Sequence, residues 1–156
     1  MDPVALQVLE AIRDRLKAID GSGDFTFNVG ERVYLGRLFL NPNDIPGISV
    51  LEDDDPFEVE DNGTRYKETG TYRVQGVVAA DDDNPLKAGH QLLADMKRAL
   101  FLAPNGPEFE KLGDVPTSMT YTGRQVFQRE DGQRHCEAHL FLTVAHFETW
   151  GDPTAT

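Results

Sequence analysis

The chain has 156 residues, of which 39% are hydrophobic and 27% charged, the size and composition of one soluble globular domain. Fifteen lysines and arginines against 27 aspartates and glutamates give a net charge of −12. Such a surface repels nucleic-acid phosphates and anionic membranes. The charge argues against direct nucleic-acid binding, and we expect no membrane partner. No apolar run approaches the roughly 20 residues that span a bilayer.

The N-terminal sequence and the cysteine content indicate a cellular compartment. The first ten residues, MDPVALQVLE, lack the basic segment and apolar block of a secretory signal. The single cysteine, Cys136, cannot form an internal disulfide or supply the usual multi-cysteine zinc site. We therefore expect a reducing cytoplasm.

The first predicted element is an amphipathic helix that ends near Ile19. Asp2 and Pro3 supply an N-cap and a proline suited to the first helical turn. Apolar residues then recur at every fourth position, which predicts one buried face; they are Val4, Val8, Ile12 and Leu16.

The middle of the chain is predicted to form strands. Residues 24–29 (DFTFNV) and 32–40 (RVYLGRLFL) carry aromatic and β-branched side chains at short spacing, typical of strands or a hairpin. A proline-containing loop precedes a short buried strand at residues 48–52 (ISVLE). Residues 65–80 alternate between two faces, as a strand does.

The most acidic segment, Glu52–Asp61, lies between these last two strands. Seven of its ten residues are acids and none is basic, so we interpret it as a solvated loop projecting from a strand end. A loop this polar has little reason to keep Phe57 unless that ring contacts another protein. We predict such contacts from Phe57 and its acidic neighbours, namely Asp53, Asp54, Asp55 and Glu58. The alternative is that Phe57 folds back onto the core.

A second helix and a hairpin complete the chain. Asn84 and Pro85 predict the helix start, with Asp81–Asp83 near its positive end. Its buried stripe is expected at Leu86, Leu92, Leu93, Met96, Ala99 and Leu100. Residues 117–128 and 134–146, joined by the turn REDGQ, predict a long antiparallel hairpin.

This order of elements predicts an α+β fold. We expect a single, mostly antiparallel (mixed) β-sheet with two α-helices packed on one face and a long terminal β-hairpin. Residues 1–150 are assigned to one domain, and residues 151–156 (GDPTAT) are expected to be a flexible tail.

Residues 134–146, RHCEAHLFLTVAH, hold three of the four histidines. On a strand, His135, Glu137 and His139 share one face, whereas Cys136 and every second residue after it face the core, with His146 at the end. Residues four apart on a strand lie roughly 13 Å apart, too far for His135 and His139 to hold one ion. We predict no metal site here; the alternative is a His–Glu pair completed by a distant ligand.

Enzymatic motifs are missing from the sequence. It contains no G-x-S-x-G, G-x-x-x-x-G-K-[ST] or G-x-G-x-x-G motif in a suitable context. Asp81–Asp83 lack the alternating order of a calcium loop. We predict a protein that is not an enzyme, with no catalytic residue, cofactor or metal ligand.

Four stretches carry a resemblance to a known family: DIPGISVLEDDD, TYRVQGVVAADDDNP, LKAGHQLLADMKRAL and HLFLTVAHFET. Following an N-terminal amphipathic helix in this order, they resemble the tail terminator proteins of long-tailed bacteriophages and related prophage tails. The resemblance covers nearly the whole chain and lies in layout, because the family has no invariant catalytic motif to match.

The resemblance implies a structural virion protein. Tail terminators form a hexameric ring at the head-proximal end of the tail tube, stop its polymerisation and present a surface for head joining. The implied partners are copies of the same chain, the tail tube protein and a head-completion or connector protein, while DNA only passes through the ring lumen. The implied location is the virion tail, after assembly in the host cytoplasm. For the isolated chain, the charge of −12 favours a monomer at low salt.

Three alternatives stay open at the level of sequence. One is a head–tail joining or tail tube protein of similar fold. Another is a small metal-dependent enzyme that uses His135, Glu137 or His139 with Asp81–Asp83. The third is a small-molecule binding module with a pocket between helices and sheet.

Overall fold

The computed structural model describes residues 1–101, 109–112, 115–130 and 134–156. Its elements are α1 (Val4–Leu16), β1 (Val33–Leu35), η1 (Pro42–Asp44), β2 (Gly47–Glu52), β3 (Glu58–Asn62), β4 (Arg65–Ala79), α2 (Lys87–Phe101), β5 (Phe109–Leu112), β6 (Val115–Gln128) and β7 (His135–Thr149).

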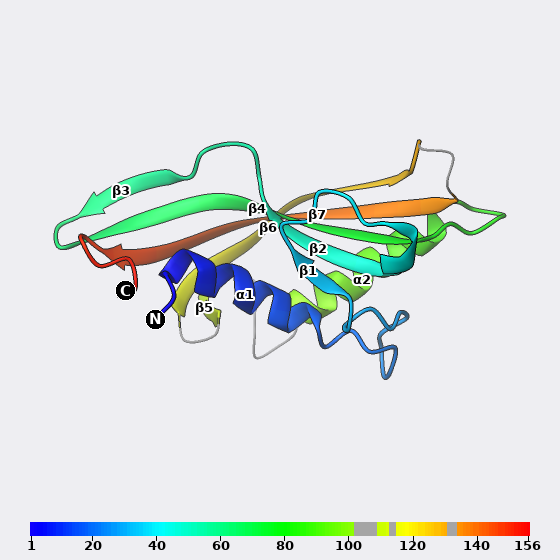
Figure 1. Cartoon of the computed structure of the whole chain (residues 1–156), viewed down its shortest axis with the longest axis horizontal. Coiled ribbons are helices and arrows are strands. Elements are labelled where there is room, and N and C mark those ends of the chain that lie inside the picture. The colour runs from blue at the N-terminus through cyan, green and yellow to red at the C-terminus, as the bar shows by residue number, and fades with distance from the viewer. Residues whose placement is uncertain (102–108, 113–114, 131–133) are drawn as a thin grey trace.

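One seven-stranded sheet runs the length of the molecule (Figure 1). The strand order is β1-β2-β4-β7-β6-β5, and β3 pairs with β4 beyond the end of β2. Only β1 and β2 are parallel, and the other pairs are antiparallel. Both helices lie on the same side of the sheet (Figure 1). The predicted α+β architecture is therefore confirmed.

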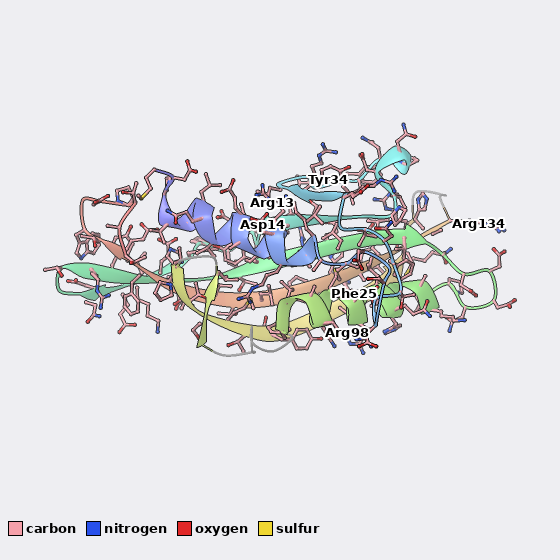
Figure 2. All side chains as sticks on the ribbon, turned by 90° about the horizontal axis from the view of Figure 1, so that it is seen from below. Arg13, Asp14, Phe25, Tyr34, Arg98 and Arg134 are labelled. Atoms are coloured by element: carbon pink, nitrogen blue, oxygen red, sulfur yellow. The ribbon has the colours of Figure 1, made fainter. Side chains whose placement is uncertain are left out.

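The N-terminal helix buries the predicted face. Its buried residues are Val4, Val8, Ile12 and Leu16, while Arg13 and Asp14 form an ion pair on its outer side (Figure 2). The predicted cap by Asp2 is wrong, because Pro3 holds the N-cap position and no described side chain caps the helix. The Val4 N–H instead donates to the Pro153 carbonyl at 2.8 Å.

The strand predicted at residues 24–29 is wrong. This segment forms only an isolated bridge between Asp20 and Asn28. The reason lies in α2: the buried Asp95 carboxylate accepts hydrogen bonds from the backbone N–H groups of Thr26 and Phe27 at 2.9 Å. A side chain thus takes the place of a neighbouring strand as the partner of this backbone.

The acidic segment is a loop only in part. Strand β2 ends at Glu52, residues 53–57 form the loop, and Glu58–Asn62 pair with β4 as β3. The prediction of a loop is therefore wrong for Glu58–Asp61. All five β3 residues are exposed, so the strand depends on backbone hydrogen bonding at the sheet edge and not on a buried face.

The second helix begins later than predicted, at Lys87. Leu86 is 38% exposed and does not join the buried stripe, whereas the other five predicted residues are buried. Helix and sheet approach closely at Gly89, where an added Cβ would lie 2.5 Å from Cys136 Sγ. This glycine therefore sets the distance between α2 and β7.

The terminal hairpin and the core face of β7 are confirmed. β6 and β7 pair antiparallel with one register shift at Tyr121 and Gly123; part of the predicted turn, residues 131–133, lies outside the described residues. The core-facing side chains of β7 are fully buried between sheet and helices, namely Cys136, Ala138, Leu140, Leu142 and Val144.

The C-terminal residues turn back along the chain. The Thr149 N–H donates to the Ala155 carbonyl at 2.8 Å, and the Pro153 carbonyl accepts the hydrogen bond from the Val4 N–H at the start of α1. The predicted flexibility of residues 151–156 stays a prediction that a measurement of backbone dynamics would test. None of the described helices is long and apolar enough to span a membrane.

Candidate interaction surfaces

The predicted contact residues lie where β2 passes into β3. Asp54, Asp55 and Glu58 are exposed, and Asp53 is half-buried. The Asp53 N–H donates to the Thr71 carbonyl at 2.9 Å, which fixes the start of the loop against β4. The exposed carboxylates therefore form a negative surface on a backbone tied to the sheet at both ends.

Phe57 does not project from this loop. Its ring packs edge-on against Tyr72, with ring centroids 5.3 Å apart, and joins the border of the core. An added Cβ at Gly70 would lie 2.1 Å from the Phe57 ring, so the missing side chain at Gly70 makes room for it. The structure thus places Phe57 as the alternative interpretation expected, and its contact with another protein stays a prediction.

A second surface lies on the sheet face opposite the helices. Residues 37–41 cross this face, and a network of buried polar groups holds them there. Glu137 is its centre: Oε1 accepts from Gln75 Nε2 at 2.9 Å and lies 3.0 Å from His139 Nε2, and Oε2 accepts from Arg129 Nε at 3.0 Å. Arg129 also donates to the Leu40 carbonyl at 3.0 Å. The network connects β4, β7 and Arg129, the residue that follows β6, to the crossing segment.

The charge of Glu137 follows from these contacts. Burial raises the pKa of this carboxyl, but the hydrogen bonds from His139 and Arg129 outweigh burial, so its pKa lies below the ordinary value. The ionised carboxylate neutralises Arg129 inside the protein. Such a pair is stable only when its hydrogen bonds are made, as they are here.

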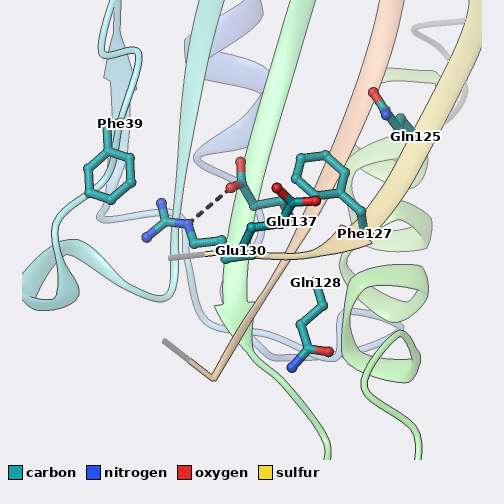
Figure 3. Close-up of a pocket in the computed structure, with 7 residues that line it drawn as sticks. Phe39, Gln125, Phe127, Gln128, Glu130 and Glu137 are labelled. Atoms are coloured by element: carbon teal, nitrogen blue, oxygen red, sulfur yellow. Dashed lines mark hydrogen bonds and ion pairs between the residues drawn. The ribbon is translucent and has the colours of Figure 1, made fainter. Parts of the chain in front are cut away.

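A cavity of about 490 Å³ opens beside this network (Figure 3). The Arg129 guanidinium lies 4.2 Å from the centre of the Phe39 ring. Phe39 is 53% exposed and the adjacent Leu38 is 72% exposed. Exposed apolar side chains beside a cavity are typical of a contact surface. The cavity is lined by Phe39, Gln125, Phe127, Gln128, Arg129, Glu130 and Glu137.

The sequence located part of this surface. It correctly placed His135, Glu137 and His139 on one face of β7, yet it did not predict that Glu137 and His139 are buried there. The alternative pocket between helices and sheet was expected on the other side of the sheet. Among the described residues, these three side chains and Asp81–Asp83 do not bring three ligand atoms within 4.8 Å of one another; Asp82 instead pairs with Arg134 at 2.8 Å.

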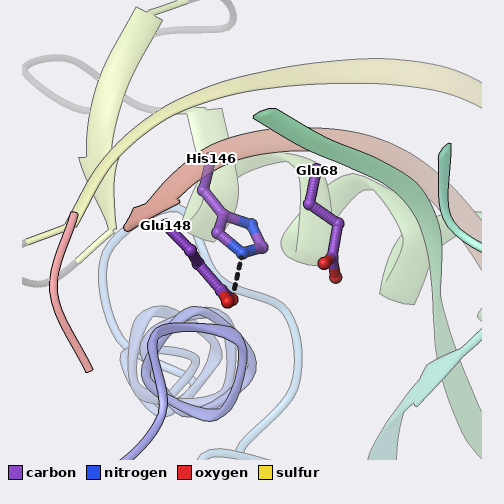
Figure 4. Close-up of side chains that lie close together, drawn as sticks. All are labelled: Glu68, His146 and Glu148. Atoms are coloured by element: carbon purple, nitrogen blue, oxygen red, sulfur yellow. Dashed lines mark hydrogen bonds and ion pairs between the residues drawn. The ribbon is translucent and has the colours of Figure 1, made fainter. Parts of the chain in front are cut away.

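A third group, Glu68, His146 and Glu148, lies on the helix side of the sheet (Figure 4). His146 is buried at the end of the core face, as predicted. The sequence interpretation missed Glu68 and Glu148. The alternation of side chains along β4 could have indicated Glu68. One face of this strand carries Tyr66, Glu68, Gly70 and Tyr72, so its buried face continues into polar residues.

Comparison with known proteins gives a fold relationship. No protein-family model and no curated protein matches the chain. Among solved structures, a chain from the virion of a native gene transfer agent particle is similar over 94% of this chain and 96% of that chain, with a TM-score of 0.54 and 14% sequence identity. The two chains share a fold over nearly their whole lengths.

Proposed function

We propose that this protein is a structural, non-enzymatic component of a phage-like virion. The observation that carries the proposal is the shared fold with a chain of a gene transfer agent virion, which extends over 94% of this chain. The absence of catalytic motifs from the sequence is compatible with this role.

Within the virion, the proposed role is that of a tail terminator. The protein would form a hexameric ring on the head-proximal end of the tail tube, stop tube polymerisation and provide the surface for head joining. The resemblance in the order of elements supports this assignment, and a joining or tube protein of similar fold is the alternative. The virion tail is the proposed location, and the host cytoplasm the proposed site of assembly.

The two surfaces suit a ring subunit. Each subunit of a ring contacts its neighbours through two different patches, because a head-to-tail interface pairs unlike surfaces. The acidic β3 edge lies at one end of the elongated molecule, and the segment around η1 lies in the opposite half (Figure 1). An acidic lumen would also repel DNA and let it pass.

Disruption of the gene in particle-producing cells tests the proposal. A terminator predicts tail tubes of uncontrolled length that do not join heads, seen by negative-stain electron microscopy. Tails of normal length without heads would identify a joining protein, and an absence of tubes would identify a tube protein. Normal infectious particles would contradict a virion role.

A control separates loss of the protein from loss of neighbouring genes. Expression of the intact chain from a plasmid should restore tails of normal length. The Leu38→Asp, Phe39→Asp double variant, which places charge on the exposed apolar pair, should restore them poorly if this surface contacts a neighbour. A variant that folds normally and complements fully would show that the pair contacts nothing essential.

A further inference from the structure

Exposed hydrophobic side chains lie in pairs at two places in the described part of the chain. Leu38 and Phe39 are 72% and 53% exposed, and Val59 and Trp150 are 55% and 51% exposed. Single exposed hydrophobic residues are normal on a protein surface, whereas exposed apolar patches mark contacts with other molecules. The two patches lie in opposite halves of the elongated molecule (Figure 1).

The Val59–Trp150 patch is held in place by its neighbours. Alternate residues of a strand share a face, so Val59 points the same way as Asp61, which accepts a hydrogen bond from Trp150 Nε1 at 3.2 Å. The Trp150 ring also packs on Tyr66, with ring centroids 4.3 Å apart. Trp150 is therefore ordered in advance while about half of it stays exposed, which suits an anchor residue of an interface.

The charge beside this patch is negative. Glu58 and Glu60 flank Val59 on β3, and both are exposed. Among the described strands, β3 pairs only with β4, so its outer edge is open to a partner. Two copies that met through this same patch would bring Glu58 and Glu60 next to the equivalent carboxylates of the other copy. Such a contact between like charges is unfavourable.

The Leu38–Phe39 patch offers positive charge instead. Arg37 precedes it and pairs with Asp44 at 3.3 Å, and the Arg37 side chain is 48% exposed against 22% for Asp44. The positive group is therefore the more accessible one. Phe39 also borders the cavity of about 490 Å³, together with Phe127 (Figure 3). A cavity of this size has room for an aromatic side chain from another molecule.

We propose that the Val59–Trp150 patch of one copy of this chain docks on the Leu38–Phe39 patch of the next copy. Apolar surface then meets apolar surface, Trp150 enters the cavity, and the acidic flank of β3 approaches Arg37. Each copy contributes a different patch, so the contact is head-to-tail, and such contacts close into rings or extend into filaments. The assignment rests on the proposed function, in which copies of this chain form a ring.

Cysteine cross-linking of the purified full-length chain tests which patches meet. At about 1 M NaCl the screening length of about 3 Å removes the repulsion between whole chains. Leu38→Cys and Val59→Cys chains, mixed and treated with a short flexible bismaleimide, should form a cross-linked dimer that neither variant forms alone. The parent chain gives the background, because its single cysteine, Cys136, is buried. Leu86→Cys is the matched control: Leu86 is 38% exposed and belongs to neither patch, so this variant should not cross-link to Val59→Cys.

A second measurement does not depend on cross-linking. Val59→Asp places a charge in the apolar contact and should weaken association at the same salt concentration by at least about tenfold, measured by sedimentation velocity over a range of protein concentrations. The matched control is Leu6→Asp on α1, where Leu6 is 37% exposed; it should associate as the parent chain does. Both positions are exposed, so both variants should keep the melting temperature of the parent chain.

Four results would overturn the inference. These are a parent chain that stays monomeric at high salt, cross-links only between identical variants, equal cross-linking by Leu86→Cys, and equal association of Val59→Asp and the parent chain. Cross-links between identical variants would indicate a two-fold contact. The virion role is tested separately by disruption of the gene, so the interface and the proposed function can fail independently.

Discussion

The buried side chain of Glu137 connects several elements of the fold. Its carboxylate accepts hydrogen bonds from Gln75 on β4 and from Arg129, which follows β6, and it contacts His139 on its own strand. Arg129 in turn donates to the Leu40 carbonyl. Removing one partner of a buried ion pair leaves the other charge uncompensated. The contribution of Glu137 to stability should therefore depend on its ionisation.

We expect Glu137→Gln to lower the free energy of unfolding by about 3 kcal/mol at neutral pH. The folded-state pKa of Glu137 is below its ordinary value of 4.5, so the unfolded chain takes up the proton first as pH falls. The difference in the free energy of unfolding between parent and variant should have its full size above pH 4.5. It should shrink as pH falls toward the folded-state pKa. Urea unfolding at a series of pH values measures it, and a constant difference would contradict the prediction.

Leu93 and Leu142 test the assignment of the core. Leu142 on β7 is fully buried and Leu93 on α2 is 3% exposed. Replacing either by alanine should lower the free energy of unfolding by about 2 to 5 kcal/mol, because each change removes buried surface and leaves a cavity. Leu38→Ala is the matched control, since exposed substitutions usually stay within about 0.5 kcal/mol. Unchanged denaturation midpoints for both core variants would show that the face assignment is wrong.

At the scale of elements, the passage from β2 to β3 combines a packed ring with a charged surface. Phe57 lies over Gly70 and against Tyr72, while Asp54, Asp55 and Glu58 are exposed. The ring and the carboxylates can be changed separately. This makes stability and partner binding separable properties of one segment.

We expect Phe57→Ala to lower the free energy of unfolding by about 1 to 2 kcal/mol. This is less than the loss of about 3 to 5 kcal/mol for a fully buried phenylalanine, because Phe57 is half-buried. Thermal and chemical denaturation measure the effect. A variant that melts normally but yields fewer head-joinable tails would show that the ring acts as a contact residue instead.

The exposed carboxylates of this segment should contribute little to stability, in contrast to the Phe57 ring. A triple variant with Asp54→Asn, Asp55→Asn and Glu58→Gln should keep the melting temperature of the parent chain, because exposed charges contribute little to stability. If the acidic surface selects a basic partner, the triple variant should assemble more slowly and with a weaker dependence on salt. Unchanged assembly would exclude these residues from the contact.

At the scale of the whole molecule, net charge opposes association between copies. Each chain carries −12, and the screening length falls from about 30 Å at about 0.01 M salt to about 3 Å at about 1 M. We expect sedimentation velocity to show a monomer at low salt and a shift toward larger species at high salt. A ring that is stable at low salt and dissociates at high salt would mean that opposite charges hold the subunits together.

The sequence by itself determined the elements whose pattern repeats locally. The stripe of Val4, Val8, Ile12 and Leu16, and the alternation along β4 and β7, depend only on the period of one helix or one strand. These elements require a sheet covered on one side, which is why the α+β class also followed from the sequence. The faces of β7 were predictable for the same reason.

Tertiary structure decided what depends on contacts between distant segments. Residues 24–29 have strand composition, but Asp95 on α2 takes their backbone hydrogen bonds. Phe57 has the surroundings of an exposed residue, but Gly70 makes space for it on β4. Glu68 meets His146 only through the register of β4 and β7. Register and burial are set by the packing of the whole sheet, and no local period in the sequence encodes them.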